Sequence, residues 1–219
     1  MRRAYIDSHL SLVDAYREAT RWAEAIDCVI GPSTAAIERS PWLERSGIPL
    51  GVASNRHTRF TARPHGLVVA WCLNLEEILE LEHRNQLSGV VAVQAPAGLR
   101  PWVAAHNVEH IGEDALETVP AVPPSIKALV KGITSMAVTN QGLTDKRERS
   151  EAIQALTYFH TRGHHLDPLQ LTLEAIRNDW PGQAPIELAQ IAHDVRAGRQ
   201  LRHSNRIDEE LLAEWANAA

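Results

Sequence analysis

The sequence predicts an α/β sheet domain followed by an all-α helical bundle, and three observations lead to this. The apolar runs Gly66–Asn74 and Gly89–Gln94 are typical of strands buried on both faces. The first run leads directly into apolar residues at helical spacing, as a parallel strand leads into its crossover helix. Residues 113–125 contain three prolines and no periodicity, and every segment after them has helical spacing.

We therefore expect two domains. At 219 residues and 24.3 kDa the chain is long enough to bury one large core or two smaller ones. Residues 1–117 are assigned to the α/β domain and residues 118–219 to the helical domain, with a proline-rich linker at 118–125. The α/β part is expected to hold a Rossmann-like, mostly parallel sheet of about five strands.

Composition limits the classes of function. The net charge of -5 and the 44% hydrophobic content are ordinary for a globular protein and exclude a surface that is basic all over. Any basic site must therefore be local. Cys28 and Cys72 both fall in apolar segments that are candidate strands, where a thiol acts as a small hydrophobe. The longest apolar run, Leu67–Leu73, is too short to cross a bilayer, so we expect a cytoplasmic protein with no membrane partner.

Local patterns predict the remaining elements of the first domain. Asp7 or Ser8 is expected to cap an amphipathic helix that extends to Ile26 and is the first element of the chain. Further strands are expected at Cys28–Ile30, Ile48–Ala53 and Val108–Ile111, and further helices at 33–38, 41–47, 74–87 and 101–106. No regular structure is expected between Ser54 and His65.

The second domain is expected to contain helices alone. Asp167 is a candidate N-cap with proline in the first turn behind it, and Gly163 and Gly198 are candidate helix ends. The expected helices are Ile126–Val138, Lys146–Arg162, Pro168–Asp179, Ile186–Ala197 and Ile207–Trp215.

An anion site is predicted where the strands of the sheet end. In open α/β sheets, ligands bind at the carboxyl edge, where loops and helix N-termini present free N–H groups. This prediction requires the apolar segments near positions 50, 70 and 92 to lie side by side. Dinucleotide and P-loop glycine motifs are absent, and helix capping is the alternative role for the hydroxyls and amides. The candidate residues are Ser33, Thr34, Ser54, Asn55, Arg56, Arg59, Arg63, Asn74 and Gln94.

A second anion-binding candidate is the arginine-rich stretch that follows the helix at 186–197. Arginine at this density suits the phosphate backbone of nucleic acids. The alternative is that these cations interact with the C-terminus of that helix and with the acids at 208–210. The candidate residues are Arg196, Arg199, Arg202, His203 and Arg206.

Two patterns raise the question of a metal. Carboxylates hold Mg²⁺ in metal-dependent nucleases. Several acidic residues are expected near strand ends or in first helical turns, and these are Asp7, Glu38, Glu76 or Glu77, and Asp114. The opening Ala4-Tyr5-Ile6-Asp7, with Leu10 and Leu12, resembles the first strand of PIN-type ribonucleases, which implies metal-dependent phosphodiester hydrolysis. His160, His164 and His165 lie near Asp167, but a helix that ends at Gly163 separates them, so no metal site is assigned.

These observations support three hypotheses. The first is a non-catalytic cytoplasmic module that binds a phosphate-containing ligand or nucleic acid through the sheet edge and the arginine-rich stretch. The second is the PIN-like metal-dependent hydrolase. The third is a self-association or protein-interaction module, with Leu211, Leu212 and Trp215 as contacts. The sequence identifies no cofactor.

Overall fold

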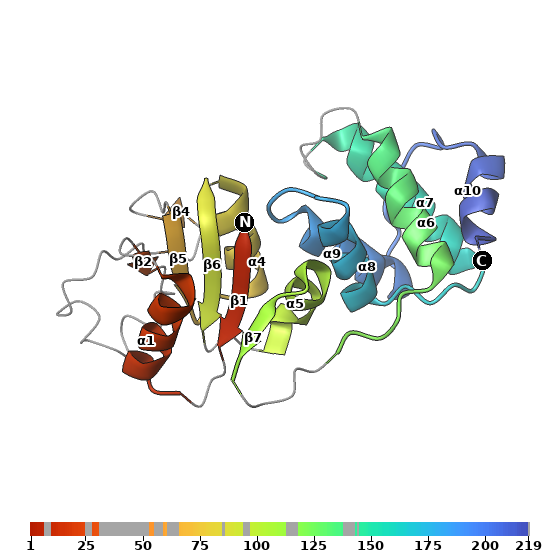
Figure 1. Cartoon of the computed structure of the whole chain (residues 1–219). Coiled ribbons are helices and arrows are strands. Elements are labelled where there is room, and N and C mark those ends of the chain that lie inside the picture. The colour runs from red at the N-terminus through yellow and green to blue at the C-terminus, as the bar shows by residue number, and fades with distance from the viewer. Residues whose placement is uncertain are drawn as a thin grey trace. The chain divides into compact units, whose positions relative to one another are not determined.

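A computed structural model describes residues 1–6, 10–24, 28–30, 53–54, 59–60, 66–84, 86–93, 97–112, 118–137, 143 and 145–218. The chain divides into two compact units, Met1–Glu117 and Thr118–Ala219 (Figure 1). The first unit is mixed α/β with a parallel sheet, and the described part of the second is helical.

The parallel sheet has the strand order β2-β5-β6-β1-β7, and every neighbouring pair in it is parallel. Within it, Val68 of β5 lies opposite Val90 of β6, and Ala70 lies opposite Ala92. The prediction that the apolar segments near 70 and 92 lie side by side is therefore confirmed. The strands are β1 (Arg2–Ile6), β2 (Cys28–Ile30), β5 (Gly66–Trp71), β6 (Leu87–Val93) and β7 (Glu109–Ile111).

The expectation that the chain begins with a helix is wrong, because β1 comes first and lies between β6 and β7. Ala4 and Ile6 are fully buried, whereas Arg3 and Tyr5, which alternate with them, are half-buried. Five residues of alternating character are too short a pattern to identify a strand alone. Burial between two neighbours distant in sequence makes this segment a strand.

The segment near position 50 is also expected to join this sheet. For Ala53, the one residue of the expected strand Ile48–Ala53 that the structure describes, this expectation is wrong. β3 (Ala53–Ser54) pairs antiparallel with β4 (Arg59–Phe60) in a separate two-stranded sheet. A parallel connection needs a crossover of about a dozen residues, whereas four residues suffice for an antiparallel turn. Residues 48–52, like the helices expected at 33–38 and 41–47, lie outside the described residues.

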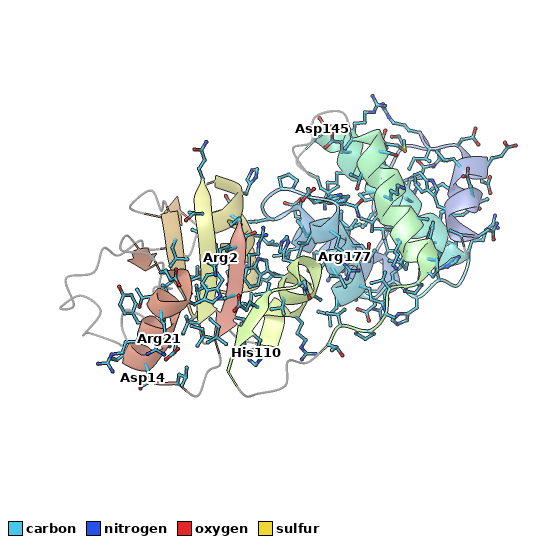
Figure 2. All side chains as sticks on the ribbon, in the orientation of Figure 1. Arg2, Asp14, Arg21, His110, Asp145 and Arg177 are labelled. Carbon is cyan, nitrogen blue, oxygen red and sulfur yellow. The ribbon has the colours of Figure 1, made fainter. Side chains whose placement is uncertain are left out.

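Helix α1 (Leu12–Ala23) covers one face of the parallel sheet. It begins later than expected, because Ser11 and not Asp7 or Ser8 is its N-cap and accepts a hydrogen bond from the Asp14 N–H at 3.2 Å. Asp14 and Arg21 lie on its exposed side (Figure 2).

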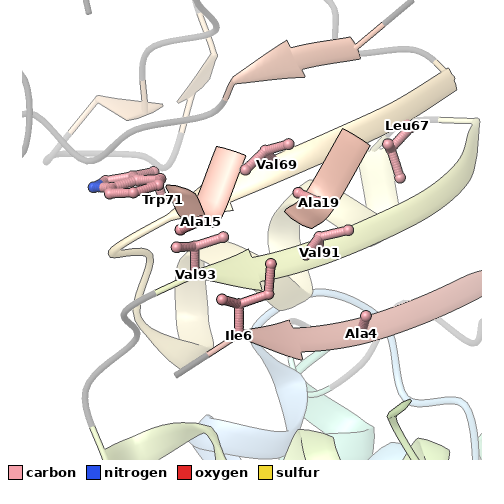
Figure 3. Packing of buried hydrophobic residues seen from close by; sticks show 9 residues of the cluster. All are labelled: Ala4, Ile6, Ala15, Ala19, Leu67, Val69, Trp71, Val91 and Val93. Atoms are coloured by element: carbon pink, nitrogen blue, oxygen red, sulfur yellow. The ribbon is translucent and has the colours of Figure 1, made fainter. Parts of the chain in front are cut away.

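The core between α1 and the sheet is built from small helix residues and branched strand residues (Figure 3). Ala15 and Ala19 of α1 are fully buried, so the helix approaches the strands closely. The strand residues of this cluster alternate along each strand, as period-2 geometry requires. They are Ala4, Ile6, Leu67, Val69, Trp71, Val91 and Val93.

The opposite face is joined to α4 (Leu75–Arg84) and α5 (Arg100–His106), which follows the 3₁₀ helix Ala97–Leu99. Arg3 of β1 donates from Nε and Nη2 to the two carboxylate oxygens of Glu82, at 2.8 and 3.1 Å. The buried Trp102 donates from Nε1 to Glu82 Oε1 at 3.1 Å. One carboxylate of α4 therefore links β1 to α5.

The expectation that both cysteines lie in strands is wrong for Cys72. Cys28 lies in β2, but Cys72 lies one residue beyond β5, is half-buried and has a φ of 51°. The apolar run predicts one strand to Asn74, whereas the chain leaves the sheet after Trp71.

The helical unit is arranged around α8, in which seven consecutive residues from Gln170 to Ile176 are buried. Helix α8 packs on α9 and α6, and α10 packs on α6 and α7. None of the helices described in the structure is both long and apolar enough to span a membrane. The helices are α6 (Pro124–Met136), α7 (Lys146–Thr161), α8 (Pro168–Arg177), α9 (Ala184–Arg196) and α10 (Glu209–Ala216).

Helix termini in this unit follow local sequence chemistry. Asp167 caps α8 by accepting from Leu169 N at 2.8 Å, as predicted. Gly163 and Gly198 follow the ends of α7 and α9 with φ of 83° and 72°, as predicted. After Gly163, the His164 N–H donates to the Phe159 carbonyl at 3.0 Å, which completes a Schellman motif.

Candidate anion-binding site

Three of the residues predicted for the sheet-edge site, Ser54, Arg59 and Asn74, lie within the residues that the structure describes. Ser54 and Arg59 pair with each other in the small antiparallel sheet, so they belong to a different sheet from the one that leads to Asn74. The remaining candidates, Ser33, Thr34, Asn55, Arg56, Arg63 and Gln94, lie outside the described residues.

Asn74 takes part in a reciprocal cap at the start of α4. Its Oδ1 accepts from the Glu77 N–H at 2.9 Å, and its own N–H donates to Glu77 Oε2 at 2.8 Å. This is the hydrogen-bond pattern of a capping box. Burial of Glu77, which is 9% exposed, raises the pKa of its carboxyl, and the nearby charge of Glu76 acts in the same direction. The bond from the Asn74 N–H opposes this rise without cancelling it.

Replacing Glu77 with glutamine is expected to keep the cap and to remove a pH dependence of stability. Because the pKa of Glu77 is higher in the folded state, its ionised form opposes folding. The free energy of unfolding of the unmodified protein should therefore rise relative to that of Glu77→Gln as the pH falls from 7 through the raised pKa towards 4. Urea denaturation of both proteins across this range measures the difference, and a difference that is constant with pH would contradict the expectation.

Of the acids considered for a metal, Asp7, Glu38 and Asp114 lie outside the described residues. Glu76 and Glu77 occupy the first turn of α4, where Glu77 forms the cap. Within the described ranges, no three His, Cys, Asp or Glu side chains form a group that could hold a metal ion.

The histidines near the end of α7 are separated by the turn that follows it. The His164 ring packs on Phe159 with ring centroids 4.8 Å apart, whereas His160 and His165 are exposed. The helix ends at Thr161, so these histidines do not share a helix face.

The arginine-rich stretch divides into engaged and available cations. Arg196 Nη1 donates to the Leu166 carbonyl at 3.2 Å. Arg199 Nη1 forms an ion pair with Asp194 Oδ1 at 2.9 Å. These two arginines therefore serve the local structure around the end of α9.

The other three members of the stretch line an open groove, which we call the basic groove. It has a volume of about 510 Å³ and is formed by the start of α7, where Figure 2 labels Asp145, and by residues 202–206. The structure thus brings together two basic segments more than fifty residues apart. The lining residues are Asp145, Lys146, Arg147, Ser150, Arg202, His203, Ser204 and Arg206.

Two polar side chains of α7 hold the second segment in place. The buried Gln154 accepts from the N–H groups of Arg206 and Ile207, both at 2.9 Å, and donates from Nε2 to the Ile207 carbonyl at 2.8 Å. Ser150 Oγ accepts from the Ser204 N–H at 2.8 Å. The backbone of 204–207 is therefore fixed, while the side chains of residues 202–206 remain exposed.

The cations of the groove differ in how far they are neutralised. Arg147 Nε donates to Glu151 Oε1 at 2.9 Å, and this hydrogen bond raises the pKa of Arg147. Asp145 uses one carboxylate oxygen to cap α7. Among the residues that the structure describes, Lys146, Arg202 and Arg206 have no acidic partner. Three cations therefore face solvent in one groove.

The sequence pattern indicates Arg202, His203 and Arg206 as candidates but not Lys146 and Arg147. The adjacent pair Lys146-Arg147 predicts only the start of a helix. No local spacing relates residue 146 to residue 202, so the signal that unites them is tertiary.

Two residues proposed for self-association are buried inside the helical unit. Leu212 is 2% exposed and Trp215 is 8% exposed, and α10 packs on α6. These two side chains therefore form part of the core of their own unit.

The fold and the groove define a mixed α/β protein whose helical C-terminal unit carries a basic surface. Residues 123–216, which make up most of that unit, match a family described as a domain of unknown function, DUF1889. Comparison with curated proteins gives no match. Comparison with solved structures gives none either.

Proposed function

We propose that the protein is a non-catalytic cytoplasmic module that binds an anionic partner, a phosphate-containing ligand or a nucleic acid, through the basic groove. The observation that carries this proposal is the convergence of Lys146, Arg202 and Arg206 on one open groove. Exposed cations without acidic partners can exchange water and counterions for phosphate oxygens.

The positive charge of the groove is local. Residues 118–219 contain 11 Lys and Arg against 12 Asp and Glu, so the helical unit has no general excess of positive charge. Between Arg196 and Arg206 the chain has four arginines and no acid. A groove of this kind attracts an anion to one place rather than to the whole surface.

The proposal treats residues 1–117 as a Rossmann-like domain and residues 118–219 as a separate helical domain. Parallel pairing of β5 with β6, with α4 as their connection, supports the first assignment.

Arginine-to-glutamine variants test the proposal with inorganic polyphosphate as the probe. The double variant Arg202→Gln with Arg206→Gln is expected to bind polyphosphate about tenfold more weakly, because two charge-assisted contacts are lost. Isothermal titration calorimetry of the full chain measures the affinity, and circular dichroism confirms that each variant is folded.

The matched control is Arg199→Gln, three residues from Arg202 in the same segment. Arg199 is already paired with Asp194, so its replacement should change the affinity less than about twofold. Equal loss of affinity in Arg199→Gln and in Arg202→Gln would refute the proposed function.

A further inference from the structure

Five backbone N–H groups in or next to the basic groove already donate to groups within the protein. The N–H of Ser204 donates to Ser150, and those of Arg206 and Ile207 donate to Gln154. At the start of α7, the N–H groups of Arg147 and Glu148 donate to Asp145. Sites for a compact phosphate usually present free backbone N–H groups at a helix start or in a nest. At these five positions no such donor remains.

The cationic donors of the groove are exposed side chains around an open depression. Lys146, Arg202 and Arg206 extend from two separate segments, and their residues are all exposed. Small ligands are usually enclosed by a concave, mostly apolar site that buries most of their surface. Long, exposed cations at several points instead suit a polymer that presents phosphates at regular intervals.

Among the described residues, the basic groove has too few rings to stack nucleic-acid bases. His203 is the one ring among the described residues that line it. Binding of single strands normally uses several aromatic side chains on which successive bases stack. A duplex keeps its bases stacked inside and offers its phosphates outside, so it needs no such platform.

From these three features we infer that the ligand of the basic groove is the phosphate backbone of a double-stranded nucleic acid, bound without sequence preference. This inference rests on the proposed function and narrows it to one class of anion. Lys146, Arg202 and Arg206 each contact a phosphate. Release of counterions from about three phosphates makes the logarithm of the affinity fall with the logarithm of the salt concentration with a slope of about -2.7.

Fluorescence anisotropy of the full chain with labelled oligonucleotides tests the inference. The probes are a duplex of about 20 base pairs, a second duplex of scrambled sequence and one of the single strands, each titrated at several salt concentrations. The affinities of the two duplexes are expected to agree within about twofold, and each should show the salt dependence with a slope of about -2.7. The single strand is expected to bind more weakly. Arg202→Gln should reduce the slope by about 1, and Arg199→Gln should leave it unchanged.

Competition with inorganic polyphosphate, pyrophosphate and poly-glutamate distinguishes a failure of this inference from a failure of the proposed function. Tighter binding of the single strand, a preference for one duplex sequence, or equal competition by poly-glutamate would overturn the inference. Binding of polyphosphate or pyrophosphate in an Arg202-dependent manner without binding of duplex would also overturn it, while the proposed function would stand. Binding of none of these probes would refute both.

Discussion

Replacing Gly132 with alanine is expected to destabilise the helical unit, although alanine is the better helix former. Gly132 lies inside α6, and a Cβ atom built on it would lie 2.3 Å from Cε2 and Cζ2 of Trp215. In an open helix the exchange would stabilise by about 1 kcal/mol. Here the indole of Trp215, 8% exposed and part of α10, would have to move, and overpacking of this kind costs about 1–3 kcal/mol. Urea denaturation measures the net change.

A double-mutant cycle isolates the contact between these two residues. Trp215→Ala alone should cost about 3–5 kcal/mol, because it removes a large buried side chain. In that background Gly132→Ala should become neutral or stabilising, since the obstacle is gone. The coupling between the two sites should then exceed about 1 kcal/mol. A stabilising effect of Gly132→Ala in the unmodified protein would show that Trp215 does not pack on Gly132.

Replacing Gln154 with alanine is expected both to destabilise the helical unit and to weaken anion binding. The variant loses three hydrogen bonds to the backbone of residues 206 and 207. It leaves the buried Ile207 with an unpaired N–H and carbonyl, so we expect a loss of about 3 kcal/mol. Because Arg202 and Arg206 are then held less firmly beside Lys146, affinity for polyphosphate should fall although no cation has been removed.

Gln170 provides the matched control for this variant. It is also buried, and its Nε2 donates to the Ala121 carbonyl at 2.9 Å, away from the groove-lining residues. Gln170→Ala should therefore lower stability, which urea denaturation measures, but leave the affinity for polyphosphate unchanged in calorimetry. Unchanged affinity in a folded Gln154→Ala protein would show that residues 202–206 do not need α7 to bind an anion.

Local chemistry made several elements predictable. A carboxylate one residue before a proline led to Asp167 as the cap of α8, and a glycine after a periodic segment led to the ends at Gly163 and Gly198. Each of these features depends on backbone groups within a few residues of the side chain concerned. Linear sequence contains all the partners.

Features built from distant partners were not predictable in the same way. β1 is a strand because β6 and β7 lie on either side of it, and Ala53–Ser54 pairs antiparallel with Arg59–Phe60 instead of joining the parallel sheet. The sequence pattern of such short segments is compatible with more than one partner. Pairing with a neighbouring strand decides between them.

By itself, the sequence predicted two domains, and it determined the apolar strand pair near residues 70 and 92 and the presence of an arginine-rich stretch. Tertiary structure decided which of those arginines remain available. Asp194 neutralises Arg199, whereas Gln154 and Ser150 hold Arg206 and its neighbours beside Lys146. The physical reason is that the sequence alone shows which residues are charged, whereas the neutralisation of each charge depends on which groups folding brings within hydrogen-bonding distance.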